Sequence, residues 1–174
     1  PNPYDPSKPS VFKDWRINGW TDMREALAVS SDVYFYSIGG GYADQKGLGI
    51  SLIDKYLQMF GLDKTTGIPL VGEVEGIIPT PEWKKEKFNG DIWRLGDTYI
   101  TAIGQYGTQV TPINAVRFVV ALANKGKLLK PSLLPGGDPQ AVEEILDFAP
   151  DEWQVVQEGM RESVTDGTSV ALNV

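Results

Sequence analysis

Glycine and proline divide this chain into short segments, and their placement constrains the fold more than any other feature of the sequence. The 174 residues include 19 Gly and 12 Pro, residue types that favour turns and end helices. Four prolines lie within residues 1–20, where we expect an extended, turn-rich lead-in. Residues 64–89 carry Gly or Pro at short intervals, and there we expect a long ordered loop.

Between these breakers, capping residues and the spacing of apolar residues predict six helices. Thr21 with Glu25 is typical of a helix N-terminus, and Thr111 followed by Pro112 is typical of another. Helices are expected at residues 21–28, 31–39, 49–60, 96–103, 112–124 and 151–164, and strands at residues 127–134 and 141–148. Because no repeat or linker divides the chain, the sequence predicts one α-rich unit with few strands.

Missing residue types exclude several kinds of site. The chain has no Cys and no His, so it offers no zinc site of the usual kind and no Ser-His or Cys-His relay. Its formal net charge of -7 argues against binding of nucleic acid or an anionic membrane surface. The Asp residues lack calcium-loop spacing and no glycine-rich phosphate loop is present, so we expect no metal and no cofactor. No apolar run is long enough for a transmembrane helix, so any membrane anchor is expected outside this piece.

The most informative motif is Ser30-Ser31-Asp32, which places a hydroxyl and a carboxylate at the start of an apolar helix. One interpretation is an ordinary helix N-cap, because Ser and Asp are common there. The other is a pair of polar side chains presented to a cleft, anchored by the aromatic residues that follow. Without His, nucleophilic chemistry here would need Lys or a carboxylate as its base.

Three sequence blocks together resemble the transpeptidase domain of class B penicillin-binding proteins. They are residues 20–36 with the Ser30-Ser31-Asp32 motif, residues 96–105 from Gly96-Asp97-Thr98 to Gly104-Gln105, and Val110-Thr111-Pro112. The resemblance runs from about Phe12 to Val174, and Asp as the third motif residue is most similar to the elongation-type penicillin-binding protein 2 group. It implies that residues 1–174 are an α-rich fragment of the α/β penicillin-binding protein and β-lactamase-like fold, with mostly helices and a few short strands.

This family uses three motifs: Ser-x-x-Lys with the nucleophile, Ser-x-Asn or Ser-x-Asp on the opposite wall, and Lys-[Ser/Thr]-Gly on a strand edge. By resemblance, Ser30 relays a proton between two lysines toward the leaving amine, and Asp32 holds the substrate amide and the first-motif lysine. Ser31 is expected to point away or to offer only its backbone. Gly104 and Gln105 are expected near the cleft, either as substrate-binding residues or, for Gly104, as a helix C-cap.

The reaction implied by the resemblance is attack on a D-Ala-D-Ala stem peptide, release of the last D-Ala and transfer of the acyl group to a neighbouring strand. A Ser-Lys pair performs such acyl transfer without His when burial and nearby positive charge keep the lysine neutral. The resemblance also implies inhibition by β-lactams and partners among the cell-wall elongation proteins. The implied location is the extracytoplasmic face of the bacterial inner membrane, with an anchor absent from this chain.

The first and third family motifs are expected outside residues 1–174, so the chain alone is expected to be inactive. Residues 10–13 do spell Ser-x-x-Lys, but they lie in the proline-rich lead-in rather than in a buried helix. Residues 64–67 miss Lys-[Ser/Thr]-Gly by one residue and follow a helix in a loop. Both are therefore interpreted as decoys.

Two other classes of function stay open at the level of sequence. The chain could be a noncatalytic helical module that binds peptidoglycan or a partner, or a relative that senses or hydrolyses β-lactams. Core packing is the expected role of four aromatic residues, with a groove for glycan or peptide as the alternative: Trp83, Trp93, Tyr99 and Tyr106. Residues 84–87 are interpreted as a solvated run of charges.

Overall fold

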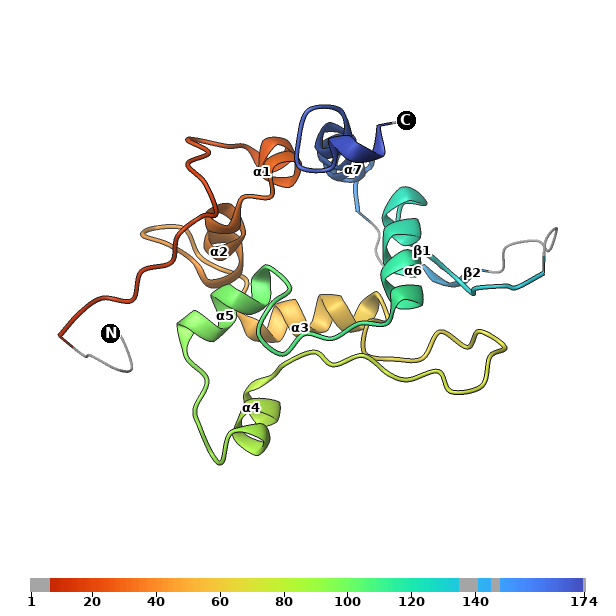
Figure 1. The fold of residues 1–174 in the computed structure, drawn as a ribbon, viewed down its shortest axis with the longest axis horizontal. Coiled ribbons are helices and arrows are strands. Elements are labelled where there is room, and N and C mark those ends of the chain that lie inside the picture. The colour runs from red at the N-terminus through yellow and green to blue at the C-terminus, as the bar shows by residue number, and fades with distance from the viewer. Residues whose placement is uncertain (1–6, 135–140, 145–147, 174) are drawn as a thin grey trace.

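Seven α-helices, one 3-10 turn and a two-stranded sheet make up the described part of the chain (Figure 1). The structure is a computed structural model that describes residues 7–134, 141–144 and 148–173. The elements are α1 (Met23–Val29), α2 (Asp32–Gly40), α3 (Ile50–Met59), α4 (Pro81–Lys87), α5 (Leu95–Ala102), α6 (Pro112–Ala123), β1 (Lys127–Leu129), β2 (Ala141–Glu144), α7 (Pro150–Thr165) and η1 (Val170–Leu172). The prediction of an α-rich chain with few strands is confirmed.

All six predicted helices are present, and their ends agree with the predictions to within about two residues, the ordinary uncertainty of helix boundaries. The first helix begins later than expected because Asp22, not Thr21, is its N-cap. The Asp22 carboxylate accepts the Glu25 backbone N–H at 3.0 Å, and the Glu25 carboxylate accepts the Asp22 N–H at 3.2 Å. This reciprocal capping box satisfies two backbone donors that the helix itself leaves unpaired.

The expected loop over residues 64–89 is wrong in its last third, because α4 forms there. The Thr80 hydroxyl accepts the Trp83 backbone N–H at 3.1 Å, and Pro81 occupies the first helical position. This Thr-Pro signature is the one that correctly predicted α6 at Thr111 and Pro112. Because residues 64–89 contain several prolines and glycines, they were interpreted as a loop, although Thr80 followed by Pro81 is the same helix-start signal as Thr111 followed by Pro112.

The two strands are shorter than the sequence predicts. β1 ends at Leu129, and β2 pairs with it antiparallel over Ala141–Glu144, with Leu128 opposite Glu143 and an irregularity between Leu128 and Leu129. Residues 135–140 and 145–147 lie outside the described residues. The sheet is therefore a small ladder beside α6 rather than a layer of the fold.

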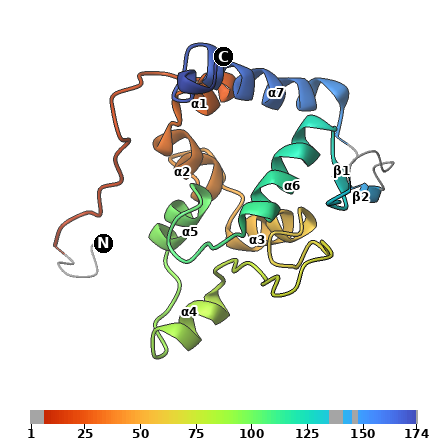
Figure 2. The same ribbon diagram turned by 45° about the vertical axis from the view of Figure 1, so that its right-hand side comes forward.

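The helices lie around a ring in the order α1, α2, α5, α3, α6 and α7 (Figures 1 and 2). The ring closes where α1, the first helix of the chain, packs against α7. There the Arg24 guanidinium donates to the Glu158 carboxylate, and the Thr168 backbone N–H donates to the Ala28 carbonyl at 3.0 Å. The position of α1, and of the residues that follow it, thus depends on a helix more than 100 residues later.

Two glycines allow these helices to approach closely. A Cβ at Gly159 in α7 would lie 2.9 Å from Leu27 Cδ1 and 3.1 Å from the Cα of Arg24 in α1. A Cβ at Gly39 in α2 would lie 2.4 Å from the Cβ of Ala102 in α5. Such distances are too short for carbon atoms, so a side chain at either position would push two helices apart.

We expect Gly159→Val to destabilise the protein by about 1–3 kcal/mol, because the added side chain cannot fit between α7 and α1. Arg161→Val is the matched control, since it adds the same β-branched residue to α7 at an exposed position. Thermal and chemical denaturation of both variants would test this. Equal losses of stability in both would show that helix propensity, and not the close approach, is responsible.

Candidate functional site

The Ser30-Ser31-Asp32 motif forms the turn that joins α1 to α2. Ser30 ends α1 in the left-handed conformation, with φ of 56° and ψ of 55°. The Ser31 backbone N–H donates to the Ala26 carbonyl at 2.9 Å, which closes a Schellman-type helix end. Glycine is the usual residue at such a position, so Ser30 holds a strained backbone conformation of the kind often found at functional sites.

The two serines of the motif have different environments. Ser31 is buried and is the N-cap of α2, so the N-cap interpretation is correct for this residue. Ser30 is exposed, and its hydroxyl makes no hydrogen bond within the part of the chain that the structure describes. The second hydroxyl of the motif is therefore used by the fold, whereas the first is available to a ligand or to another group.

A segment of the lead-in crosses this turn and holds it. The Ser31 hydroxyl donates to Asp14 Oδ2 at 2.6 Å, and the Asp32 backbone N–H donates to Asp14 Oδ1 at 3.3 Å. The Trp15 indole N–H donates to the backbone carbonyls of Val29 and Ser30, at 3.1 and 3.0 Å. Asp14 and Trp15 were not predicted as site residues, although they lie within the segment that resembles the family.

Two carboxylates, Asp14 and Asp32, lie beside the turn, and their pKa values are shifted in opposite directions. Burial acts to raise the pKa of Asp14, but hydrogen bonds from the Ser31 hydroxyl and from the backbone of Asp32 and Trp15 outweigh it, so the pKa is lowered. Burial, and then the negative charge of Asp14, raise the pKa of Asp32. The environment of Asp32 is therefore less favourable to a negative charge than that of Asp14.

The structure places Gly104 and Gln105 in the turn after α5. The C-cap of α5 is Ile103, and Gly104 follows it with φ of 75°, its backbone N–H donating to the Thr101 carbonyl at 2.9 Å, so the glycine ends the helix in the left-handed conformation. Gln105 is exposed. Within the described ranges no hydrogen bond or ion pair joins either residue to Ser30 or Asp32, and α5 packs near the other end of α2, at Gly39 and Gly40. Their role in substrate binding stays a prediction.

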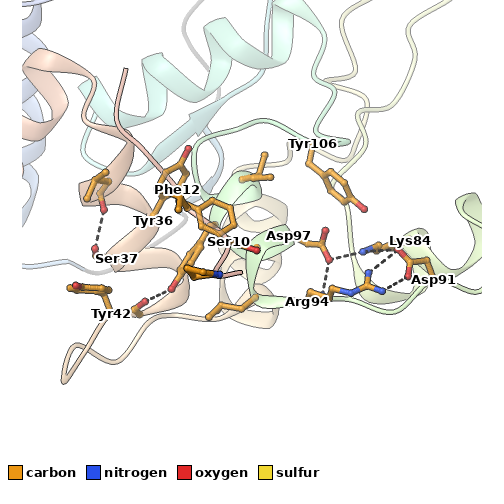
Figure 3. Close-up of a pocket in the computed structure, with 18 of the residues that line it drawn as sticks. Ser10, Phe12, Tyr36, Ser37, Tyr42, Lys84, Asp91, Arg94, Asp97 and Tyr106 are labelled. Atoms are coloured by element: carbon orange, nitrogen blue, oxygen red, sulfur yellow. Dashed lines mark hydrogen bonds and ion pairs between the residues drawn. The ribbon is translucent and has the colours of Figure 1, made fainter. Parts of the chain in front are cut away.

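A groove of about 1280 Å³ opens beside α2, one turn beyond Asp32 (Figure 3). Val33, Tyr36 and Ser37 of α2 form part of one wall, and residues 9–12 of the lead-in form another. The Phe12 ring contacts the rings of Tyr36 and Tyr99, with centroids 5.8 and 5.0 Å apart. The site turn and the groove thus share two elements, the lead-in and α2.

The predicted roles of the four aromatic residues are divided between groove and packing. Tyr99 and Tyr106 line the groove. Trp83 and Trp93 pack edge-on against the Tyr106 ring, with centroids 5.7 and 5.9 Å away. A Cβ at Gly107 would collide with Trp83, so this tryptophan supports the backbone after α5.

A cluster of paired charges forms one end of the groove (Figure 3). Lys84 is only 3% exposed, and its ammonium donates to Asp97 at 2.7 Å and lies 3.1 Å from Asp91. The Arg94 guanidinium binds both Asp91 oxygens, at 2.8 and 2.9 Å. The interpretation of Lys84 as part of a solvated charge run is wrong, because these carboxylates satisfy a buried ammonium.

Both decoy motifs have structural explanations. Ser10 and Lys13 are exposed and lie in extended backbone, so they do not share a helix face as the nucleophile and lysine of the family must. Thr66 is buried, and its hydroxyl and backbone N–H both donate to the Glu73 carboxylate, which also accepts the Gly67 N–H at 3.1 Å. Residues 64–67 therefore anchor a loop and form no strand edge.

Within residues 7–134, 141–144 and 148–173, no group of acidic side chains is arranged to hold a metal ion. In the same ranges no helix is both long and apolar enough to cross a membrane. The turn offers an exposed hydroxyl at Ser30 and a partly exposed carboxylate at Asp32, and hydrogen bonds to Asp14 and Trp15 hold it.

Comparison with known proteins gives a consistent match over nearly the whole chain. Residues 1–173 match the family model of the penicillin binding protein transpeptidase domain. The peptidoglycan D,D-transpeptidase MrdA of Salmonella typhimurium is 34% identical over 164 residues, which are 86% of this chain and 25% of that protein. The chain thus spans about a quarter of the length of the curated relatives it matches.

Two solved structures from Helicobacter pylori have a similar fold. The penicillin-binding protein PBP2 superposes with a TM-score of 0.75 at 32% identity, covering 89% of this chain and 28% of that one. A complex of PBP2 with MreC superposes with a TM-score of 0.74 at 33% identity, covering 87% and 27%.

We expect Lys84→Met to destabilise the protein by about 2–4 kcal/mol, because it leaves Asp97 and Asp91 without their buried cation. Lys85→Met is the matched control on the same helix, since Lys85 is exposed, and we expect it to change stability by less than about 0.5 kcal/mol. Urea denaturation of the two variants gives the comparison. A loss in both would mean that α4 itself is sensitive to substitution.

The difference in stability between wild type and the Lys84→Met variant should also depend on pH. Hydrogen bonds from Arg94 and then Lys84 lower the pKa of Asp91, so its contribution to stability is complete above the unfolded pKa, near about 4, and is lost as pH falls through the folded pKa. The gap in melting temperature should stay constant down to about pH 4 and narrow below it. A gap that persists in strong acid would exclude the carboxylates as its cause.

Proposed function

The chain belongs to the family of penicillin-binding protein transpeptidase domains, and from this we propose that it is part of a peptidoglycan D,D-transpeptidase. Such an enzyme cross-links stem peptides through a serine acyl-enzyme, and its nucleophile is also acylated by penicillins. The observation that carries the proposal is the agreement of the family match with a Ser-x-Asp turn whose first hydroxyl is free and exposed.

In the proposed mechanism, Ser30 passes a proton between the nucleophile's lysine and the lysine of the third motif, toward the leaving amine. A hydroxyl suits this role because it donates and accepts at once, and the Ser30 hydroxyl has no partner within the described residues that would compete. Asp32 accepts hydrogen bonds from the substrate amide and from the first-motif lysine, with the strength that a charged acceptor adds. Ser31 supports the turn through Asp14 and has no chemical step.

We propose that residues 1–174 form only part of the transpeptidase domain. The Ser-x-x-Lys segment would precede them and the Lys-Thr-Gly strand would follow them in the parent protein. Two observations support this. The chain matches only 25% of the length of the Salmonella relative, and residues 10–13 and 64–67 form neither the helix of the first motif nor the strand edge of the third. The chain alone is then expected to be inactive.

The proposed partners are peptidoglycan stem peptides as substrate, β-lactams as inhibitors and proteins of cell-wall elongation. The Helicobacter pylori PBP2 structure in complex with MreC supports an assembly of this kind. Since cell-wall cross-linking occurs outside the cytoplasm, we place the parent at the extracytoplasmic face of the bacterial inner membrane, tethered by a segment outside this chain.

Intact-mass spectrometry with a penicillin would test the proposed function. We expect a covalent adduct on the full-length parent and none on residues 1–174 alone, because the nucleophile lies outside this chain. An adduct mapped to Ser10 would overturn the assignment of that residue as a decoy. If the parent formed no adduct, the noncatalytic binding module would become the better explanation.

Substitution of Ser30 would separate its chemical role from its structural one. Ser30→Gly relieves the left-handed strain, so we expect stability to rise by up to about 1 kcal/mol. The same variant should lose penicillin acylation by on the order of 10²-fold or more, because the relay hydroxyl is gone. Ser30→Ala, which keeps the strain, should lose acylation equally without the gain in melting temperature. Wild-type acylation in both variants would exclude Ser30 from the mechanism.

A further inference from the structure

The Ser30 turn requires support from outside its own helices. Its left-handed backbone is unfavourable for any residue with a Cβ, and the chain passes from α1 to α2 with only Ser30 and Ser31 between them. A strained turn persists only where the surrounding structure holds it in place. The contacts that do so here come from the lead-in, 14 to 18 residues earlier in the sequence.

Asp14 fixes the start of α2 from two directions. One carboxylate oxygen accepts the Ser31 hydroxyl at 2.6 Å, and the other accepts the Asp32 backbone N–H at 3.3 Å. A negative charge at a helix N-terminus is itself favourable, because the unpaired N–H groups carry partial positive charge. The first of these bonds also consumes the hydrogen of Ser31, which leaves Ser30 as the free hydroxyl of the motif.

Trp15 fixes the end of α1. Its single indole N–H is shared by the carbonyls of Val29 and Ser30, two acceptors that α1 cannot satisfy itself. The Arg16 guanidinium lies 4.6 Å from the centre of the Trp15 ring, within cation–π distance, while the ring itself stays exposed. Neighbouring residues of one extended segment thus hold both sides of the turn.

We propose that Asp14 and Trp15 are positioning residues that hold the Ser30 hydroxyl and the Asp32 carboxylate in the geometry the reaction needs. This inference rests on the proposed function. A simple helix cap would require only the bond that the Ser31 hydroxyl accepts from the Tyr34 N–H. Here four further hydrogen bonds join the turn to two adjacent side chains: Asp14 accepts two of them, and the Trp15 indole N–H is shared by the other two. Neither residue touches the reacting atoms in this assignment.

The charge of Asp14 gives the proposal a signature that a purely structural contact lacks. Asp14 is the charged group that acts on Asp32, and Tyr36, one turn along α2, is the titratable group on its own helix that senses both carboxylates. Removal of the Asp14 charge should lower the pKa of Asp32, because the nearby negative charge now raises it. An acidic limb in the pH profile of acylation that reports Asp32 should then move to lower pH.

The experiment compares Asp14→Asn, Asp14→Ala and Trp15→Phe in the full-length protein. The second-order rate constant for acylation by a fluorescent penicillin is measured from about pH 4 to about pH 8, with the melting temperature of each variant. Asp14→Ala should acylate at least about tenfold more slowly, since it leaves the Ser31 hydroxyl and the Asp32 N–H unpaired. Asp14→Asn should reduce the rate by less but should show the shifted acidic limb. Trp15→Phe keeps an aromatic ring but lacks the indole N–H, and it should also slow acylation.

Asp44→Asn is the control, because Asp44 is exposed in the turn after α2 and should change neither the rate nor its pH profile. Wild-type rates and an unshifted limb in both Asp14 variants would overturn the proposal. A loss of rate that matches the fraction of unfolded protein would overturn it as well.

Hydrogen exchange separates a failure of this inference from a failure of the proposed function. In Asp14→Ala the Asp32 amide should exchange at least about tenfold faster than in wild type, whatever the protein catalyses. If the wild-type parent formed no adduct, the proposed function would fail, and exchange alone would decide whether Asp14 holds the turn. Unchanged exchange in an active parent would reject the positioning role and leave the function intact.

Discussion

The one-residue reversal at Ser30 is the constraint on which the arrangement of this site depends. If α1 continued as a helix through residue 30, Ser30 and Asp32 would lie two residues apart on one helix and would not face the same side. The left-handed Ser30 instead places the end of one helix against the start of the next. Because that backbone is unfavourable, the free energy that holds it has to come from contacts elsewhere in the fold.

Those contacts join residues that are far apart in the sequence. α1 is held by α7 through the close approach at Gly159, α2 is held by α5 at Gly39, and the lead-in crosses the turn at Asp14. The hydrophobic cluster of Ala121 and Leu128, with Met59 and Phe60 against it, is small and lies where α3, α6 and β1 meet rather than at the turn. Close helix contacts and buried polar bonds therefore carry much of the specificity of this part of the fold, and a change far from Ser30 can move it.

Local signals predicted the helices and the motif, but not the groups that hold them. Capping residues and apolar spacing identified six helices because those effects act within a few residues. α4 was missed because its prolines resemble a loop, although Thr80 and Pro81 are a helix start. Lys84 was misread as solvated because a charge run gives no sign that Asp91 and Asp97, beyond the next turn, will enclose it. The role of Asp14 could not be predicted from the sequence either, since its partners Ser31 and Asp32 lie 17 and 18 residues away.

The order of residues within the motif follows from this division of roles. The second residue, Ser31, caps α2 and donates its hydroxyl hydrogen to Asp14, so this hydroxyl is buried and already hydrogen-bonded. The first residue lies on the left-handed position, where the side chain projects from the turn and no backbone group of either helix competes for it. The third residue is the first of α2, so its own N–H is fixed by Asp14 while its carboxylate stays partly exposed. To exchange the two roles, residue 31 would have to take the left-handed conformation and residue 30 would have to cap α2. The fold therefore leaves the hydroxyl at the first position free for chemistry.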